Sequence, residues 1–227
     1  KNAESARKEF TANVSHELKT PLMSISGYAE LMMNGMVPPD KMQDFSGRIF
    51  HESERLSNLV ADIIQLSRLD EKNGETMFEQ VDIGELGEDV INNLQNRAVK
   101  KKINLEYTGG PAQMQGVRHV LYEMFYNITD NAIRYTPDGG DVKVFVGKLN
   151  GKPYFRVEDN GIGIPKEHQE RIFERFYRVD KSHSKERGGT GLGLSIVKHG
   201  AILHGAKVQV DSEYGKGTRM EIIFPEK

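Results

Sequence analysis

His16 stands in a pattern that suits a chemically reactive imidazole better than a packed one. Residues 10–22 read FTANVSHELKTPL, with polar neighbours around His16 and apolar residues at helical spacing. A neutral imidazole has a nucleophilic ring nitrogen, and Glu17 could hold the proton of the other nitrogen and so fix the tautomer. Pro21 cannot donate to the carbonyl of Glu17 and crowds it, so a helix here is expected to bend just after His16.

A metal site at His16 is excluded by spacing. A histidine followed by a glutamate resembles the start of the zinc-protease pattern, which needs a second histidine four positions after the first. That position is Thr20 here, and after His51 it is Arg55. A surface histidine beside a glutamate is also common without any function. The chemistry of His16 therefore has to be judged from residues elsewhere in the chain.

Two helical asparagines could bind a magnesium ion. Asn127 and Asn131 lie four residues apart, hence on one helix face, with Arg134 and Tyr135 at the end of the same segment. Neutral amide oxygens can ligate magnesium without repelling a triphosphate, and the phosphates and waters complete the shell. The pattern is weak by itself.

Two glycine-containing segments could approach a nucleotide closely. Asp159 ends a predicted strand and is followed by Gly161, Gly163 and Ile164, so its carboxylate could accept a hydrogen bond from the amine of adenine. An ordinary Asp-Asn-Gly turn is an equal alternative at this point. Residues 189–194, GTGLGL, precede a predicted helix, whose free amide groups can bind phosphate.

The glycine segments do not follow the common nucleotide-binding signatures. No Gly-Lys is followed by serine or threonine as in a P-loop, and no G-x-G-x-x-G follows the first strand of a βαβ unit. A P-loop or Rossmann enzyme is therefore not expected. Residues 179–188 are charged and almost devoid of apolar side chains, so we expect a mobile segment that could close over a nucleotide.

The apolar periodicity predicts a helical hairpin before these segments. Apolar residues recur at three- and four-residue steps over residues 2–36 and again over 42–66, with Pro38-Pro39 between. Asp40, with Gln43 three residues later, resembles a capping box. Two helices leave apolar stripes exposed, so a second copy completing a four-helix bundle is expected. The alternative is that the stripes pack on the rest of the same chain.

The remaining residues predict an α/β domain, so the fold class is α+β. We place a helical domain at residues 1–73 and a second domain at 74–227, with a linker near Gly74. An Asn150-Gly151 turn should join two strands of a hairpin. Strands are expected at 78–83, 103–107, 142–146, 154–158, 207–211 and 219–224, and helices at 84–101, 115–135 and after Gly191.

Composition limits the possible partners. The net charge is −2, no apolar run approaches the roughly 20 residues that span a bilayer, and there is no cysteine. We therefore expect no nucleic-acid partner, no membrane contact by this fragment and no disulfide. The basic run at Arg97 and residues 100–102 is interpreted as a helix C-terminus. Because the chain opens at Lys1 in a helical pattern, we expect an excised fragment.

Five motifs in order resemble the catalytic core of a two-component sensor histidine kinase. The matching segments are Ser15–Pro21 (H box), Asn127–Ala132 (N box), Asp159–Gly163 (G1 box), Phe173–Arg178 (F box) and Gly189–Leu194 (G2 box). The resemblance implies a dimerisation and phosphotransfer hairpin followed by a Bergerat-type ATP-binding domain of the kind found in gyrase. The amino-acid sequence of Tyr122–Tyr135 is most similar to that of phosphate-regulon sensors.

The resemblance also implies residue roles. His16 would accept the γ-phosphoryl group of ATP, Glu17 would polarise its imidazole, and Arg178 would stabilise the transferring charge. Thr20 would orient a water for dephosphorylation of the partner, unless it is only a helix-surface threonine. Magnesium would be bound by Asn131 and Asn127. The implied ATP-binding residues are Asn127, Asn131, Arg134, Tyr135, Asp159, Gly161, Gly163, Ile164, Tyr177, Gly189, Thr190, Gly191, Leu192, Gly193, Leu194 and Thr218.

The implied activity is autophosphorylation of a homodimer, with transfer to an aspartate of a response-regulator receiver domain. The fragment would be the cytoplasmic portion of a membrane-anchored sensor. A plain ATPase of the same fold and a non-catalytic nucleotide-binding scaffold are the alternatives. In the ATPase relatives a glutamate activates water at the position of Asn127, which favours transfer here, although Glu123 lies one turn earlier.

Overall fold

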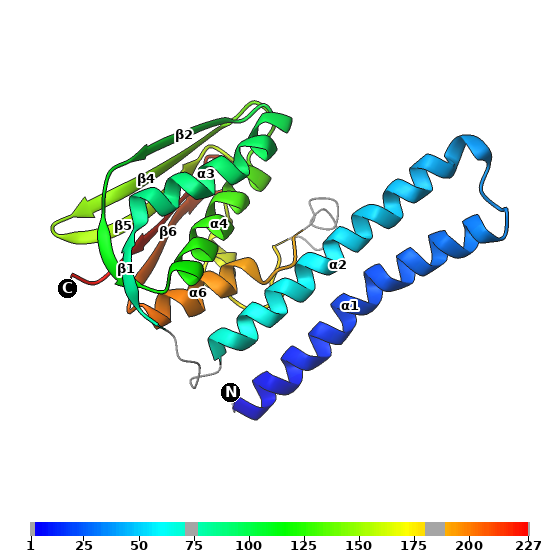
Figure 1. Cartoon of the computed structure of the whole chain (residues 1–227), viewed down its shortest axis with the longest axis horizontal. Helices are drawn as coiled ribbons and strands as arrows, with labels where there is room; N and C mark the ends of the chain where they lie inside the picture. Colours follow the sequence, from blue (N-terminus) through cyan, green and yellow to red (C-terminus); the bar gives the residue numbers. More distant parts are fainter. Residues whose placement is uncertain (1–2, 71–76, 180–188, 227) are drawn as a thin grey trace.

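The computed structural model describes residues 3–70, 77–179 and 189–226 and comprises a helical hairpin beside an α/β domain (Figure 1). The hairpin consists of α1 (Ala3–Met33), a 3-10 turn at Pro39–Lys41 and α2 (Met42–Asp70). The first strand of the domain begins at Glu79. The predicted boundary between residues 73 and 74 and most of the predicted lid at 179–188 lie outside the described residues.

The helix α1 is continuous through Pro21. The Oγ1 hydroxyl of Thr20 donates to the carbonyl of His16 at 3.2 Å, and the hydroxyl of Ser24 donates to the carbonyl of Thr20 at 3.3 Å. Both side-chain bonds span four residues, as do the backbone hydrogen bonds of an α-helix, one of which Pro21 cannot make. The single long helix that the periodicity predicts is confirmed through Pro21, and the bend expected just after His16 stays a prediction.

The predicted capping box at Asp40 and Gln43 is wrong. Asp40 lies inside the 3-10 turn, which begins after Pro38 without any side-chain cap. Met42, at the end of that turn, already has α-helical dihedrals of −57° and −41°. The chain thus enters α2 directly from the turn and leaves no extended residue to act as a separate N-cap.

The hairpin exposes apolar side chains. Tyr28 and Phe45 pack edge to face across α1 and α2, with ring centroids 5.4 Å apart. Other large apolar side chains of the two helices remain in solvent in the single chain, among them Leu22, Met23, Phe50, Val60 and Ile64. These exposed residues fit the expectation of a second helical hairpin, whereas Leu59 and Leu66 of α2 are buried against the α/β domain, as in the alternative that the stripes pack on the rest of the same chain.

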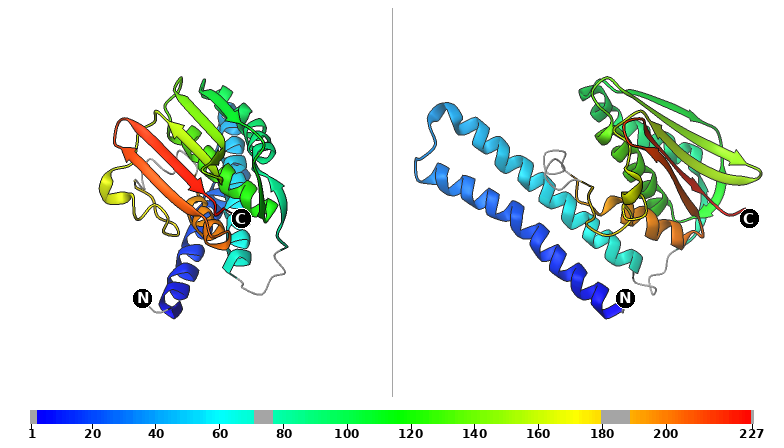
Figure 2. Two further views of the ribbon diagram at one scale, coloured as in Figure 1. Left: turned by 90° about the vertical axis from the view of Figure 1, so that its left-hand side faces the viewer. Right: turned by 180° about the vertical axis from the view of Figure 1, so that it is seen from behind.

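The domain is a five-stranded sheet with helices on one face (Figures 1 and 2). The strand order is β2-β4-β5-β7-β6, where only the β2–β4 pair is parallel. The elements are β1 (Glu79–Asp82), α3 (Ile83–Lys100), β2 (Asn104–Gly109), β3 (Gln113–Gly116), α4 (Arg118–Tyr135), β4 (Asp141–Leu149), β5 (Lys152–Asp159), a 3-10 turn (Lys166–His168), α6 (Gly193–Leu203), β6 (Lys207–Glu213) and β7 (Gly217–Ile223).

Strand β3 was not predicted. It pairs antiparallel with β1 in a separate two-stranded sheet, with Met114 opposite Val81. Its four residues, QMQG, contain one large apolar side chain, too little for a recognisable alternation. The predicted hairpin turn is confirmed, because Asn150 and Gly151 both have positive φ, 51° and 80°.

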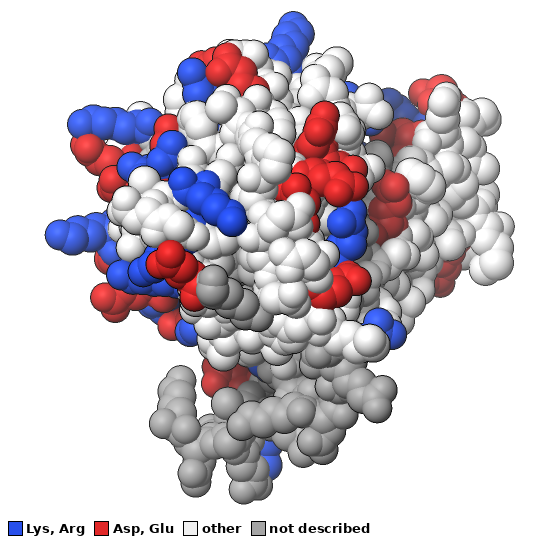
Figure 3. All heavy atoms as spheres, turned by 60° about the vertical axis from the view of Figure 1, so that its left-hand side comes forward, with Lys and Arg blue, Asp and Glu red and all other residues white. Residues whose placement is uncertain are grey.

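Charges of both signs are interspersed on the face of the molecule shown in Figure 3. No helix among the described ranges is long and apolar enough to span a bilayer. Lys101, from the predicted basic helix end, donates through Nζ to the carbonyls of Ile133, Arg134 and Thr136 at 2.8, 3.0 and 2.5 Å. It therefore caps the C-terminus of α4, the neighbouring helix, rather than simply ending its own.

The core that positions α4 is centred on an aromatic stack. The rings of Phe125 on α4 and Phe155 on β5 lie parallel, with centroids 3.9 Å apart, and Phe224 packs edge-on at 6.3 Å. All three side chains are fully buried. This stack attaches the apolar face of α4 to the sheet and turns its polar face away from it.

Replacing Phe155 with alanine is expected to lower the free energy of unfolding of the domain by about 3–5 kcal/mol, because a stacked ring is replaced by a cavity. Chemical denaturation with circular dichroism measures this. Leu149→Ala is the matched control, since Leu149 is mostly exposed on the neighbouring strand and should change stability by less than about 0.5 kcal/mol. Equal losses in the two variants would contradict the assigned core.

Candidate active site

A cavity of about 730 Å³ lies between α4, the turn after β5, the glycine-rich segment before α6, and α2 of the hairpin. Its volume suits a ligand of nucleotide size. The sequence-predicted residues that line it are Asn127, Asn131, Arg134, Tyr135, Asp159, Gly163, Ile164, Tyr177, Arg178, Gly189, Thr190, Gly191, Gly193, Leu194 and Thr218. Gly161, Leu192 and the H-box residues His16, Glu17 and Thr20 are not in this lining.

Helix α4 presents its polar face to the cavity. Asn127 donates through Nδ2 to the carbonyl of Glu123 at 2.9 Å, which leaves its Oδ1 on the side of Gly193. A Cβ at Gly193 would lie only 2.4 Å from that oxygen, so a residue with a side chain would displace Asn127. Asn131 lines the cavity one turn later. The two amide groups are therefore brought to one wall, as their spacing predicted.

Arg134 is held by a carboxylate behind it. Its Nη2 lies 2.7 Å from Oδ2 of Asp130, and Nη1 of Arg97 from α3 lies 2.5 Å from the other oxygen of Asp130. The Nη1 of Arg134 is buried and has no hydrogen-bond partner within the described ranges. A buried donor without a partner is costly, so its position beside Gly189 favours an anionic ligand there.

The turn after β5 fixes Asp159 against the cavity. Its Oδ1 accepts hydrogen bonds from the backbone N–H of Gly161 at 2.9 Å and of Thr218 at 3.2 Å. Burial raises the pKa of Asp159, and these two bonds oppose the rise. A Cβ at Gly161 would lie 2.7 Å from Oδ1, and Gly163 has a φ of 67° with the carbonyl of Glu213 against it. The tight turn and the binding role are thus compatible, because the carboxyl remains in the cavity wall.

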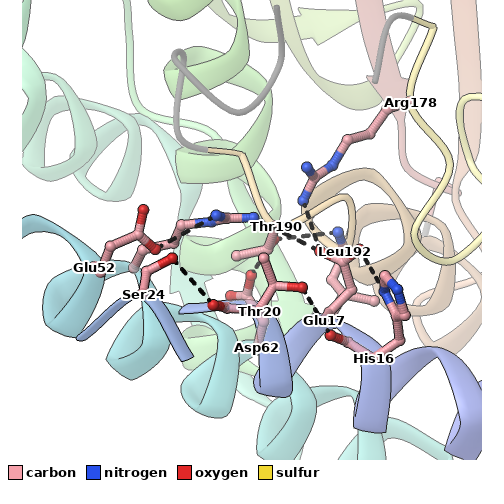
Figure 4. A network of polar contacts seen from close by, with 10 residues as sticks. His16, Glu17, Thr20, Ser24, Glu52, Asp62, Arg178, Thr190 and Leu192 are labelled. Carbon is pink, nitrogen blue, oxygen red and sulfur yellow. Dashed lines mark hydrogen bonds and ion pairs between the residues drawn. The ribbon is translucent and has the colours of Figure 1, made fainter. Parts of the chain in front are cut away.

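Helix α2 closes the cavity, which the sequence did not predict. The hydroxyl of Thr190 donates to Oδ2 of Asp62 at 2.6 Å and accepts from the backbone N–H of Leu192 at 3.2 Å (Figure 4). Burial raises the pKa of Asp62, and the bond from Thr190 opposes it. Asn58, Ala61, Asp62 and Gln65 line the same wall.

Apolar contacts hold this wall together. Leu192 is not a cavity residue; it is fully buried in a cluster with Ile196 of α6 and Leu59 and Leu66 of α2. Leu192 therefore anchors the glycine-rich segment to the hairpin. Helix α1 makes a separate contact with the F box. The ring of Phe10 on α1 lies 5.8 Å from that of Phe176, and the guanidinium of Arg175 lies 4.9 Å from the Phe10 ring.

His16 lies at the edge of the site on α1. Its side chain is 81% exposed, and its Nδ1 is 4.0 Å from Oε1 of Glu17, beyond hydrogen-bond distance. Oε2 of Glu17 instead faces the guanidinium of Arg178 at 3.4 Å (Figure 4). The guanidinium of Arg55 lies 3.7 Å from the same oxygen. In this arrangement Glu17 does not orient the imidazole; the predicted polarising role stays a prediction.

Arg178 connects the histidine helix to the cavity. It lines the cavity, and its side chain is only 10% exposed while it faces Glu17. Burial lowers the pKa of Arg178, whereas Glu17 raises it. Its F-box neighbour Tyr177 is fixed by a 2.6 Å hydrogen bond between its hydroxyl and Nδ1 of His168, and the guanidinium of Arg171 lies 4.3 Å from its ring.

Glu123 also reaches the cavity. It lies on the lining one turn before Asn127, and burial together with the nearby Asp62 raises its pKa. A carboxylate of raised pKa in a cavity is a candidate base. Its presence weakens the sequence argument against hydrolysis, which depended on asparagine at position 127.

Comparison with known proteins agrees with this architecture. Residues 6–72 match the model of the His Kinase A (phospho-acceptor) domain, and residues 116–227 match that of the histidine kinase-, DNA gyrase B-, and HSP90-like ATPase. The hairpin thus corresponds to the phospho-acceptor module, and most of the α/β domain corresponds to the ATPase module. The chain belongs to the sensor histidine kinases.

Two curated relatives cover nearly the whole chain. The sensor-like histidine kinase SenX3 of Mycolicibacterium smegmatis is 37% identical over 98% of this chain and 58% of its own length. The phosphate regulon sensor protein PhoR of Pseudomonas aeruginosa is 35% identical over 97% of this chain and 50% of its own length. This chain therefore spans about half the length of these relatives. The similarity to PhoR agrees with the resemblance of the N-box helix to phosphate-regulon sensors.

A solved structure supports the same assignment. The mycobacterial sensor histidine kinase MprB is 31% identical, with a TM-score of 0.58, and the match covers 66% of this chain and 99% of that one.

The burial of Asp159 predicts a pH-dependent stability. Because the pKa of Asp159 is raised in the folded chain, ionisation of this carboxyl lowers the free energy of unfolding at any pH above that pKa. This loss of stability disappears as the pH falls below the ordinary pKa of an aspartate, about 3.9. Asp159→Asn keeps an oxygen for the N–H groups of Gly161 and Thr218. The variant is therefore expected to be more stable than the unmodified chain at pH 7.5, by an amount that shrinks toward pH 4.

Urea unfolding at the two pH values measures this difference. Asp138→Asn is the control, because Asp138 is exposed in a loop. A stability difference that is the same at pH 4 and pH 7.5 would show that the ionisation of Asp159 is not the cause.

Proposed function

We propose that the chain binds Mg-ATP in the cavity and transfers its γ-phosphoryl group to His16. The observation that carries this proposal is the contact between Glu17 and Arg178, which ties the residue next to His16 to a cation in the cavity wall. A phosphoacceptor helix and a nucleotide pocket therefore meet at one arginine.

The cavity residues fit the nucleotide. The unpartnered Nη1 of Arg134 and the glycine-rich segment would hold phosphates, and the buried carboxyl of Asp159 would accept from the adenine amine. Among the described residues no three His, Cys, Asp or Glu side chains form a metal site. Magnesium would be held by the amide oxygens of Asn131 and Asn127 and by the phosphates themselves, which suits its preference for oxygen ligands.

The chemistry follows from these positions. A ring nitrogen of neutral His16 would attack the γ-phosphorus, the bond to the β-phosphate oxygen would break, and ADP would leave. The guanidinium of Arg178 would neutralise charge on the transferring group. Such transfer needs positioning and charge stabilisation more than covalent help. Glu17, freed from Arg178, could then take a proton from the second ring nitrogen.

The phosphoryl group would pass from His16 to an aspartate of a response-regulator receiver domain. Thr20 lies one turn after His16, where its hydroxyl could orient a water that hydrolyses the aspartyl phosphate of the regulator and releases inorganic phosphate. In the structure that hydroxyl donates to the carbonyl of His16, and its oxygen keeps lone pairs that can accept from such a water. The family's domain composition supports this class of partner.

The active form would be a homodimer in which two hairpins form a four-helix bundle. Exposed Leu22, Met23 and Ile64 would be buried there. We further infer that the fragment is the cytoplasmic portion of a membrane-anchored sensor, because the chain spans only about half the length of its sensor relatives.

An ATPase without phosphotransfer is the second candidate, favoured by Glu123 in the cavity. Incubation with γ-labelled ATP and magnesium distinguishes the two. We expect acid-labile, base-stable label on the protein that is lost in His16→Gln and kept in His51→Gln, the control for a second exposed helical histidine. Asn131→Ala should also lose the label. Release of free phosphate with no labelled protein would overturn the kinase proposal.

A further inference from the structure

Asp130 is a buried carboxylate inside the N-box segment, to which the sequence motifs assign no role. It lies on α4 directly before Asn131, with its side chain 11% exposed. Its two oxygens are divided between two arginines: Oδ1 faces Nη1 of Arg97, and Oδ2 accepts from Nη2 of Arg134 at 2.7 Å. A buried charge needs such pairing, and here both oxygens are occupied.

The pairing leaves one nitrogen of Arg134 for a ligand. The guanidinium has two terminal nitrogens, and Asp130 takes only Nη2. Nη1 is buried, has no partner in the part of the chain that the structure describes, and lies where a Cβ at Gly189 would be 2.9 Å away. Arg134, Asp130 and Gly189 all line the cavity. The free nitrogen is thus placed at the glycine-rich segment.

The backbone of Arg134 is fixed as well. Lys101 donates through Nζ to its carbonyl at 3.0 Å, at the C-terminal end of α4. Both ends of the arginine are therefore restrained before any ligand binds. An arginine has several rotatable bonds, so restraint in the bound orientation reduces the entropy lost on binding.

We propose that Asp130 is a positioning residue, which holds the guanidinium of Arg134 so that Nη1 meets the phosphates of the nucleotide. This inference rests on the proposed function of the cavity as an ATP site. The carboxylate itself carries the same sign of charge as the phosphates. Asp130 therefore favours ATP binding only if its positioning of Arg134 outweighs this direct repulsion. Neutralising Asp130 should weaken ATP binding if positioning dominates and strengthen it if repulsion dominates.

The test measures dissociation constants of ATP and adenosine by calorimetry for Asp130→Asn. Loss of the charge-assisted hydrogen bond should weaken ATP binding about tenfold and leave adenosine binding unchanged, because adenosine has no phosphate. Asp89→Asn is the matched control; it removes an exposed carboxylate that pairs with Arg118 at 3.3 Å, also between α3 and α4, and should change neither constant. Unchanged or tighter ATP binding by Asp130→Asn would overturn the inference.

A double-mutant cycle separates positioning from a structural defect. In an Arg134→Ala background, Asp130→Asn should cause no further loss of ATP affinity, since it acts through the missing guanidinium. An equal loss in both backgrounds would contradict this. If Asp130→Asn does not fold, Arg134→Lys serves instead. A single ammonium cannot bind Asp130 and the phosphates through two separate nitrogens, so the affinity for ATP should fall relative to that for adenosine. An unchanged ratio of the two dissociation constants would overturn the inference.

The same titrations distinguish this inference from the proposed function. If the unmodified chain binds ATP no more tightly than adenosine, or binds neither, the cavity is not a triphosphate site and the proposed function fails. If the unmodified chain prefers ATP and Asp130→Asn keeps the full preference, only the positioning role fails.

Discussion

The packing of α4 against the sheet is the constraint on which the rest of the site depends. The stacked rings of Phe125 and Phe155 bury one face of the helix, and the helical period then directs the opposite face into the cavity. That opposite face carries the two asparagines and Arg134. A shift of α4 on the sheet would displace the amides proposed to bind magnesium and the guanidinium proposed to bind phosphate together. Lys101 fixes the end of the same helix by binding its last carbonyls.

A second set of contacts joins the hairpin to this frame. Leu59 and Leu66 of α2 bury Leu192 from the glycine-rich segment, and Asp62 accepts the hydrogen bond from Thr190. The glycine-rich segment, which is expected to bind phosphates, is therefore held in place by contacts with the hairpin as well as with its own α/β domain. Because Glu17 pairs with Arg178 at the same junction, the histidine helix and the cavity share charged as well as apolar contacts (Figure 4). In the proposed transfer to His16 the Glu17–Arg178 pair would open, so this junction is where the position of the hairpin would control the reaction.

The parts that the sequence predicted are those with a local signal. Apolar periodicity located the long helices, Asn150-Gly151 located a hairpin turn, and the spacing of Asn127 and Asn131 placed both on one face of α4. The residues that were missed act through contacts distant in sequence. Asp62 meets Thr190 across 128 positions, and nothing in an amphipathic helix distinguishes it from a solvent-facing acid. Glu17 was assigned to the neighbouring His16, but adjacent helical residues point in different directions, and arginines from two other elements compete for its carboxylate.

The central claim is that α2 forms a wall of the nucleotide pocket when ATP is bound. The most direct test is the dissociation constant of ATP for Asp62→Asn, measured at pH 8. The amide oxygen can still accept from Thr190, while a negative charge in the wall that faces Glu123 and Arg134 is removed. If α2 lines the occupied pocket, the variant should bind ATP several-fold more tightly, by about 1 kcal/mol, and bind adenosine as before. Equal affinity of the variant and the unmodified chain for ATP would contradict the claim, because Asp62 would then lie away from the phosphates in the complex.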